Sequence, residues 1–157
     1  MQDKTMNAAT FRALRETVGM SVRNLAQLAH VQERTVKRWE SGAMPIPADV
    51  ERIVIDAKER QDEVVAFALA QYEALYDNAP DDVEVTIALR YWTSEAEYLE
   101  RSTDAALGAA GDWMMANATT RRCAAVLEDE GMEVTYTSDE LPREPTTPST
   151  TTLHLVD

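Results

Sequence analysis

Apolar residues in the first half of the chain recur at helical spacing, and helix-ending residues separate the groups. Asn7 and Ser21 are candidate N-caps, while Gly19 and Gly42 stand where helices end. Apolar positions of the last helix continue to about Tyr76, well beyond the usual mean of about 12 residues. Helices are therefore predicted over residues 8–18, 21–29, 32–41 and from 47 onward.

The second half changes to a two-residue period. Apolar and polar or small residues alternate from Val83 to Trp92, which predicts a strand with one drier face. Ser94 and Glu97 have the spacing of a capping box, so a short helix is expected next. A further helix is expected over about 117–130, and a second strand over 132–137.

Charge is divided unevenly along the chain. The formal net charge is −13, yet residues 1–65 carry 10 Lys and Arg against 10 Asp and Glu, whereas residues 66–157 carry 5 against 18. Three cations, Arg34, Lys37 and Arg38, fall together on the predicted third helix. A local basic surface in an otherwise acidic chain indicates contact with a polyanion.

The second and third predicted helices have the lengths and the tight turn of a helix-turn-helix. Val36 and Trp39 would face the core, which leaves the three cations on the outer side. An ordinary solvated helix face is the alternative interpretation. The helix-turn-helix context favours DNA contact, with the third helix in the major groove.

The residue types at eight positions in this region resemble the sequence pattern of a known family. The sequence over residues 7–57 is similar to the Cro/C1-type (XRE) helix-turn-helix of phage repressors and bacterial regulators. The second half is more loosely similar to two-domain autorepressors of the anti-CRISPR-associated type. The resemblance implies an ion pair within the domain between Arg15 and Glu40. It is carried by Ser21, Leu25, Ala26, Val31, Val36, Trp39, Glu40 and Gly42.

The same resemblance implies which residues contact double-stranded DNA. Arg34 and Arg38 would each offer a bidentate contact to guanine, and Glu33 would accept from a cytosine amine. Lys37 would lie near a phosphate, and Thr35 either touches a thymine methyl or packs inward. The complete predicted set is Ser21, Gln32, Glu33, Arg34, Thr35, Lys37, Arg38 and Ser41.

Two departures from the family pattern weaken the expected phosphate contacts. Val22 stands where relatives often have glutamine, and the loop after Gly42 has no basic residue. Affinity is therefore expected to depend on a homodimer that reads an inverted-repeat operator. The second half is the expected dimer-forming region, because two strands are too few for a stable isolated sheet. Dimer contact would also cover Tyr91, Trp92, Tyr98 and Trp113.

These expectations define an α+β, mainly α chain of four segments. The N-terminal segment is a bundle of four helices, and a small α/β region for dimerisation lies toward the C-terminus. The segments are a helix-turn-helix domain at 1–58, a connecting helix at 59–80, a strand-helix-helix-strand region at 81–141 and a flexible Pro/Thr-rich tail at 142–157.

Composition argues against other classes of protein. The single Cys123 and two distant histidines provide no disulfide and no metal-ligand spacing, so no metal or cofactor is expected. No nucleophile and base converge on a catalytic motif, so an enzyme is not expected. The N-terminus does not resemble a signal peptide, and no apolar run reaches the roughly 20 residues of a membrane-spanning helix. The chain is therefore expected to be cytoplasmic and not to bind a membrane. The competing hypothesis is an antitoxin-like or DNA-mimicking module whose acidic half binds a partner protein.

Overall fold

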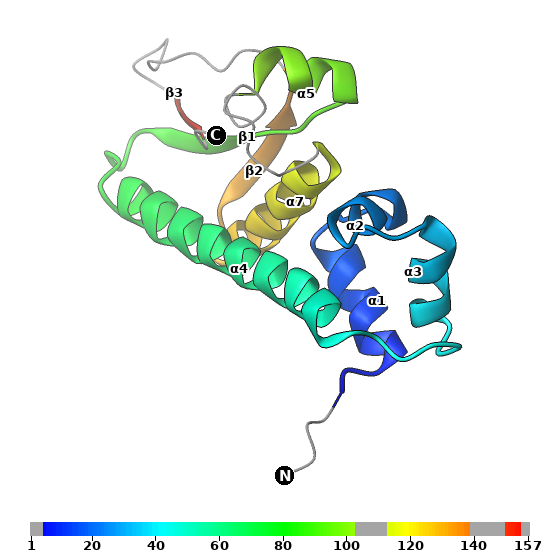
Figure 1. Cartoon of the computed structure of the whole chain (residues 1–157). Coiled ribbons are helices and arrows are strands. Elements are labelled where there is room, and N and C mark those ends of the chain that lie inside the picture. The colour runs from blue at the N-terminus through cyan, green and yellow to red at the C-terminus, as the bar shows by residue number, and fades with distance from the viewer. Residues whose placement is uncertain (1–4, 103–112, 139–149, 155–157) are drawn as a thin grey trace. The chain divides into compact units, whose positions relative to one another are not determined.

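The computed structural model describes residues 5–102, 113–138 and 150–154. The chain divides into two compact units, Met1–Asp62 and Glu63–Asp157, and the long helix α4 contributes to both (Figure 1). The architecture is α+β and mainly helical, as the sequence predicts.

The first unit is built from α1 (Ala8–Thr17), α2 (Val22–Leu28), α3 (Glu33–Glu40) and the first half of α4 (Ala48–Asp77). The predicted N-caps are confirmed. The side chain of Asn7 accepts from the backbone N–H of Thr10 at 2.8 Å, and that of Ser21 accepts from Asn24 at 3.0 Å. Both bonds satisfy donors that a helix N-terminus otherwise leaves free.

One apolar core holds the four helices of the first unit together. The rings of Phe11 and Trp39 meet edge to face with centroids 6.4 Å apart, which ties α3 to α1. The amide of Gln61 on α4 donates to the carbonyl of Thr17 at the end of α1 at 3.0 Å. The fully buried residues include Phe11, Val18, Leu25, Val36 and Val54.

The second unit contains a parallel sheet of three strands in the order β2-β1-β3. Ile87 of the central strand pairs with Val134 on one side and with Leu153 on the other. A parallel connection from β1 to β2 requires a crossover, and helices α5 and α7 lie within it. The elements are β1 (Glu84–Arg90), α5 (Glu95–Arg101), α7 (Trp113–Asp129), β2 (Glu133–Thr137) and β3 (Thr150–His154).

The core of the second unit lies where α4 and α7 pack on one face of the sheet (Figure 1). Tyr72 of α4 and Leu127 of α7 pack together with Ile87 and Leu89 of β1. Cys123 is fully buried in this cluster, as expected for a small apolar residue. Burial raises the pKa of its thiol to about 11, so the thiol stays protonated near neutral pH.

Side chains of α7 hold the end of β1 in place. Asn117 accepts from the backbone N–H of Trp92 and donates to its carbonyl, both at 2.8 Å. Thr120 donates to the carbonyl of Arg90 at 3.1 Å. These bonds satisfy backbone groups at the last residue of the strand and just after it, which would otherwise be buried without partners.

The structure corrects the expected covering of the aromatic residues and the expected pattern of β1. Trp92 and Tyr98 are 3% and 4% exposed and pack edge to face at 5.5 Å, so they are covered within one chain without a dimer. The expectation of one drier face on β1 fails at its centre. Ala88 is buried as well as Ile87 and Leu89, because β1 is the central strand.

The expected segments also differ from the structure in two places. Residues 59–77 continue α4, and Val65, Ala68 and Tyr72 on this part of it belong to the second core rather than to a spacer. The expected flexible tail is wrong for Thr150–His154, which pair with β1. Residues 142–149 and 155–157 lie outside the described part. No helix in the described part is long and apolar enough to cross a membrane.

Candidate nucleic-acid interface

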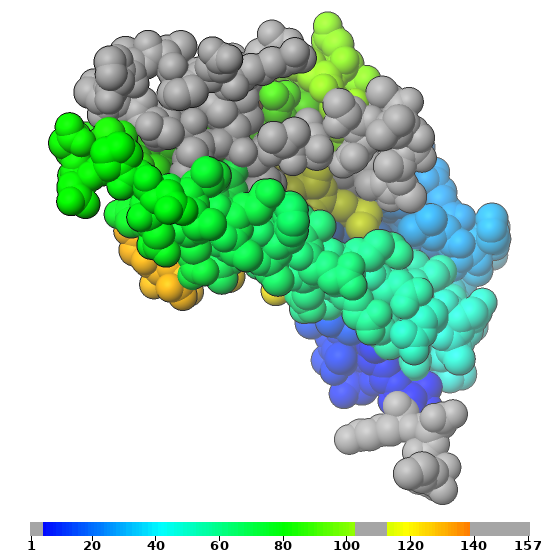
Figure 2. Space-filling view, turned by 90° about the vertical axis from the view of Figure 1, so that its left-hand side faces the viewer, coloured from blue at the N-terminus to red at the C-terminus, as the bar shows by residue number. Residues whose placement is uncertain are grey.

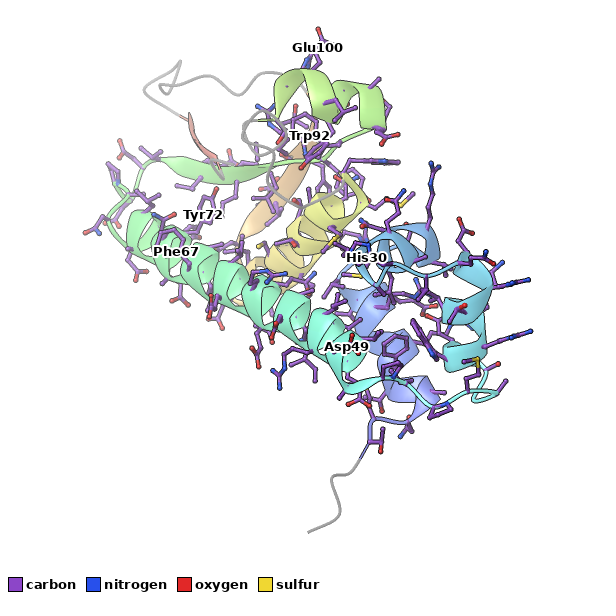
Figure 3. The ribbon with its side chains drawn as sticks, in the orientation of Figure 1. His30, Asp49, Phe67, Tyr72, Trp92 and Glu100 are labelled. Carbon is purple, nitrogen blue, oxygen red and sulfur yellow. The ribbon has the colours of Figure 1, made fainter. Side chains whose placement is uncertain are left out.

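Helix α3 separates its apolar and cationic residues onto opposite sides. Val36 and Trp39 are buried against the rest of the first unit. Arg34, Lys37 and Arg38 are exposed. Arg34 and Arg38 are four residues apart, so they lie on the same side of the helix one turn apart. Figure 3 shows side chains that end in nitrogen extending from α3 away from α1.

These cations have no acidic partner, unlike most others in the described part of the first unit. On α1, Arg12 pairs with Glu16 at 2.8 Å, and on α4, Lys58 pairs with Asp62 at 2.7 Å. Among the described cations, the residues of α2 and α3 that take part in no ion pair are Arg23, Arg34, Lys37 and Arg38. Their charge is therefore available to an external anion.

The ion pair expected between Arg15 and Glu40 is present. Arg15 Nε donates to Glu40 Oε1, and its Nη2 lies 3.3 Å from Oε2. The Arg15 side chain is 9% exposed and that of Glu40 is 8% exposed, so both charges are largely removed from water. Arg15 also donates to the carbonyl of Met20 at 2.8 Å. The pair fixes α3 against α1 and keeps the Glu40 carboxylate away from the cationic side.

The turn between α2 and α3 repeats a helix-ending geometry found elsewhere in the chain. Helices α1, α3 and α7 each end with a residue of positive φ, namely Gly19, Gly42 and Gly131. At the end of α2 this residue is His30, with φ of 55°. The N–H of Val31 bonds to the carbonyl of Ala26, which completes the same Schellman pattern. A non-glycine residue in this conformation costs about 1–2 kcal/mol.

Replacing His30 with glycine is expected to raise the free energy of unfolding of the first unit by about 1 kcal/mol, because glycine accepts positive φ without strain. Chemical denaturation followed by circular dichroism measures the change. The matched control is Gly42→Ala, where an added Cβ meets no atom within 4 Å and only the φ of 76° opposes alanine. That variant should lose about 1 kcal/mol. A destabilised His30→Gly variant would instead indicate that the imidazole holds the turn.

The remaining predicted residues border the exposed side of α3. Gln32, Glu33 and Ser41 are exposed. Gln32 precedes α3 without a side-chain capping bond, and Ser41 Oγ donates to the carbonyl of Arg38 at 3.1 Å. Thr35 is half-buried on α3. Ser21 is half-buried at the start of α2, where its hydroxyl is the N-cap.

Sequence reasoning left Arg23 out of this set. Arg23 is exposed on the first turn of α2 and takes part in no ion pair of the described residues. The signal in the sequence was its position two residues after the Ser21 cap, on the first turn of the helix that precedes α3. Within the described residues, no group of three or more His, Cys, Asp or Glu side chains is placed to hold a metal ion.

Comparison with protein families identifies the group to which this arrangement belongs. The family model described as Aca2/YdiL-like matches residues 6–132, which cover nearly all of the first unit and the second unit as far as Met132. The chain belongs to the Aca2/YdiL-like family. This is a family of helix-turn-helix regulators associated with anti-CRISPR systems. A search of curated proteins found no match.

Family membership agrees with the geometry of the first unit. The matched range covers the turn from α2 to α3, the Arg15–Glu40 pair and the cationic side of α3. Membership of the Aca2/YdiL-like family assigns the protein to the regulators.

Proposed function

We propose that the protein is a sequence-specific DNA-binding regulator of the XRE type. It acts in the cytoplasm as a homodimeric repressor of its own or a neighbouring operon. The observation that carries the proposal is the cationic side of α3, where Arg34, Lys37 and Arg38 are exposed and form no ion pair with any described residue. Membership of a regulator family supports it.

In this proposal α3 lies in the major groove, and its exposed residues have separate roles. Arg34 and Arg38 each donate two hydrogen bonds to the O6 and N7 atoms of guanine. Glu33 accepts from a cytosine amine. Lys37 and Arg23 contact phosphates, which set the position of the helix without reading sequence. Ser21, Gln32, Thr35 and Ser41 lie at the border of the same contact.

The proposal requires two copies of the chain. The loop after Gly42 carries no basic residue through Pro47, so each domain has few cations for the DNA backbone. A homodimer doubles the contacts and matches an inverted repeat whose half-sites lie about 10–10.5 base pairs apart, or a multiple of that.

A mobility-shift experiment with DNA from upstream of the gene tests the proposal. The protein is expected to retard a fragment that contains an inverted repeat and to release it as salt rises. The slope of log affinity against log salt should be about −0.9 for each phosphate contact. A reporter placed behind the same DNA should lose expression when the protein is supplied.

The proposal is overturned if no fragment is retarded even at low salt. That result would instead favour a protein partner for the second unit, in which 5 Lys and Arg stand against 19 Asp and Glu over residues 63–157. Scrambled fragments of the same length serve as the control for non-specific binding.

A further inference from the structure

An exposed carboxylate, that of Glu33, stands among the free cations of α2 and α3. Residues 18–47 all belong to the described part of the chain, and they contain two acidic residues, Glu33 and Glu40. Glu40 is paired with Arg15 and largely buried. Glu33 is exposed and takes part in no ion pair of the described residues. The four cations of the same stretch are equally without an ion pair, namely Arg23, Arg34, Lys37 and Arg38.

The cation that is best placed to neutralise Glu33 does not do so. Lys37 follows Glu33 by four residues, a spacing at which opposite charges on a helix are neighbours. No ion pair joins the two side chains. Glu33 is the first residue of α3, and the preceding Gln32 makes no side-chain capping bond. The positive end of the helix dipole therefore stabilises an anion at this position, while no described side chain occupies its oxygens.

A carboxylate at this position distinguishes between bases. In a helix-turn-helix complex, the first residues of the second helix lie at the base edges. A carboxylate that loses water there is destabilised unless it accepts a hydrogen bond. In the major groove, cytosine and adenine present an amino donor, whereas guanine and thymine present acceptor oxygens. Adenine also carries the N7 acceptor beside its amine, so cytosine is the base that Glu33 accommodates best.

Glu33 and the arginines of α3 have opposite effects on binding to an arbitrary DNA sequence. Arg34 and Arg38 attract every phosphate backbone, whatever the sequence. The Glu33 carboxylate is repelled by the same phosphates and by the acceptor atoms of guanine and thymine. Specificity of this kind comes from a repulsive element that penalises the wrong partner.

We propose that Glu33 is a specificity-determining residue that selects by repulsion. Its free carboxylate weakens contact with DNA in general, and the loss is offset only where a cytosine faces it in each half-site. This role rests on the proposed function, because it requires α3 in the major groove. It assigns to Glu33 an effect on non-specific DNA that is opposite to the effect of the neighbouring arginines.

A purely structural role for Glu33 is the alternative, since an acidic residue on the first turn stabilises a helix. The chain offers a matched control at Asp49, which is exposed on the first turn of α4 and takes part in no ion pair of the described residues. Figure 3 labels Asp49 at the start of α4, and Figure 2 shows the first turns of this helix, in turquoise, at the surface. Asp49→Asn therefore removes the same charge from an equivalent helix position.

Fluorescence anisotropy with operator and scrambled duplexes tests the proposal on the full chain. Glu33→Gln is expected to bind scrambled DNA at least about threefold more tightly than the wild-type protein, because one repulsive charge is gone. Its preference for the operator is expected to fall at least about fivefold, because the amide no longer rejects acceptor atoms. Asp49→Asn should keep the wild-type ratio of the two affinities. Melting temperatures verify that both variants remain folded.

Replacing single cytosines of the operator with uracil tests the base contact itself. Uracil opposite adenine places a carbonyl oxygen where cytosine has its amine, and it adds no methyl group. At one position in each half-site, this change is expected to lower the affinity of the wild-type protein by about tenfold. The same change should lower the affinity of Glu33→Ala by less than about twofold, because the contact is already absent.

Three outcomes would overturn the role of Glu33. These are an unchanged ratio of affinities in Glu33→Gln, an equal fall of that ratio in Asp49→Asn, and a uracil scan in which no position depends on Glu33. A Glu33→Gln variant that melts earlier with an unchanged ratio would assign the residue to helix stability alone. Failure of the proposed function gives a different result, since the wild-type protein would then show no preference between operator and scrambled DNA.

Discussion

Replacing both Arg34 and Arg38 with alanine is expected to abolish sequence-specific DNA retention while the fold stays intact. Each arginine is proposed to make a bidentate contact with guanine, worth about 1–3 kcal/mol of discrimination in each half-site. A dimer loses these contacts twice, so the difference in affinity between operator and scrambled DNA should disappear. Both side chains are exposed, so the melting temperature should change little. Fluorescence anisotropy with operator and scrambled duplexes measures both affinities.

The matched control for that prediction removes the same charge from another place. Arg12 and Arg52 are exposed in the first unit, with side chains 60% and 62% accessible. The Arg12→Ala, Arg52→Ala double variant should keep its preference for the operator. Lys37→Ala should weaken binding to both duplexes alike and lower the salt slope by about one for each subunit. Equal loss of preference in the control would contradict the assignment of readout to α3.

Breaking the Arg15–Glu40 pair on one side is expected to be strongly destabilising. Glu40→Gln removes the buried counter-charge of the Arg15 guanidinium, which is 9% exposed, and leaves it only the 54% exposed Glu16 carboxylate at 3.8 Å. Removal of one partner from a buried pair typically costs about 3–5 kcal/mol, because the other charge is left buried and uncompensated. Total stability of a domain is about 5–15 kcal/mol, so this loss would unfold a large fraction of the first unit on mild heating. Denaturant unfolding gives the change.

A double-mutant cycle separates the interaction free energy of the Arg15–Glu40 pair from the cost of burying each charge. The Arg15→Met, Glu40→Met variant removes both charges and should be more stable than Arg15→Met, in which Glu40 alone stays charged. Arg12→Ala, at the exposed end of the Arg12–Glu16 pair, is the surface comparison and should change stability little. If the single variants of Arg15 and Glu40 unfold at the same denaturant concentration as the wild-type protein, the pair does not hold α3 against α1.

Local signals in the sequence were sufficient for the helices of the first unit. Asn7 and Ser21 each accept from the backbone N–H three residues further on, an interaction that needs only residues close in the sequence. The positions of Val36 and Trp39 were predictable because a three-residue interval places both on one helix side. The Arg15–Glu40 pair joins residues 25 apart, and only the family resemblance indicated it.

Features that depend on distant partners were not predictable in this way. The strand Thr150–His154 comes from a Pro/Thr-rich segment with no strand pattern, and its pairing with β1 lies more than 60 positions back in the sequence. Burial of Trp92 depends on Tyr98 and on the bonds to Asn117 from α7. Such contacts are set by tertiary packing, which outweighs local propensity.

The exposed side of α3 illustrates the remaining limit of sequence reasoning. The helical period placed Arg34 and Arg38 outward, but it does not say whether an acidic side chain from another element neutralises them. The structure answers this for the described residues, because neither arginine takes part in an ion pair. Arg23 was missed because a single basic residue on a short helix has no periodic signal.

Dimethyl sulfate protection of guanine N7 on the upstream DNA tests whether Arg34 and Arg38 contact guanine in the major groove. If α3 reads the major groove, guanines are expected to be protected in two half-sites, about 10–10.5 base pairs apart or a multiple of that. The protection should be absent with the Arg34→Ala, Arg38→Ala variant. Protection that is unchanged by the double variant, or binding without any protected guanine, would contradict major-groove reading by α3.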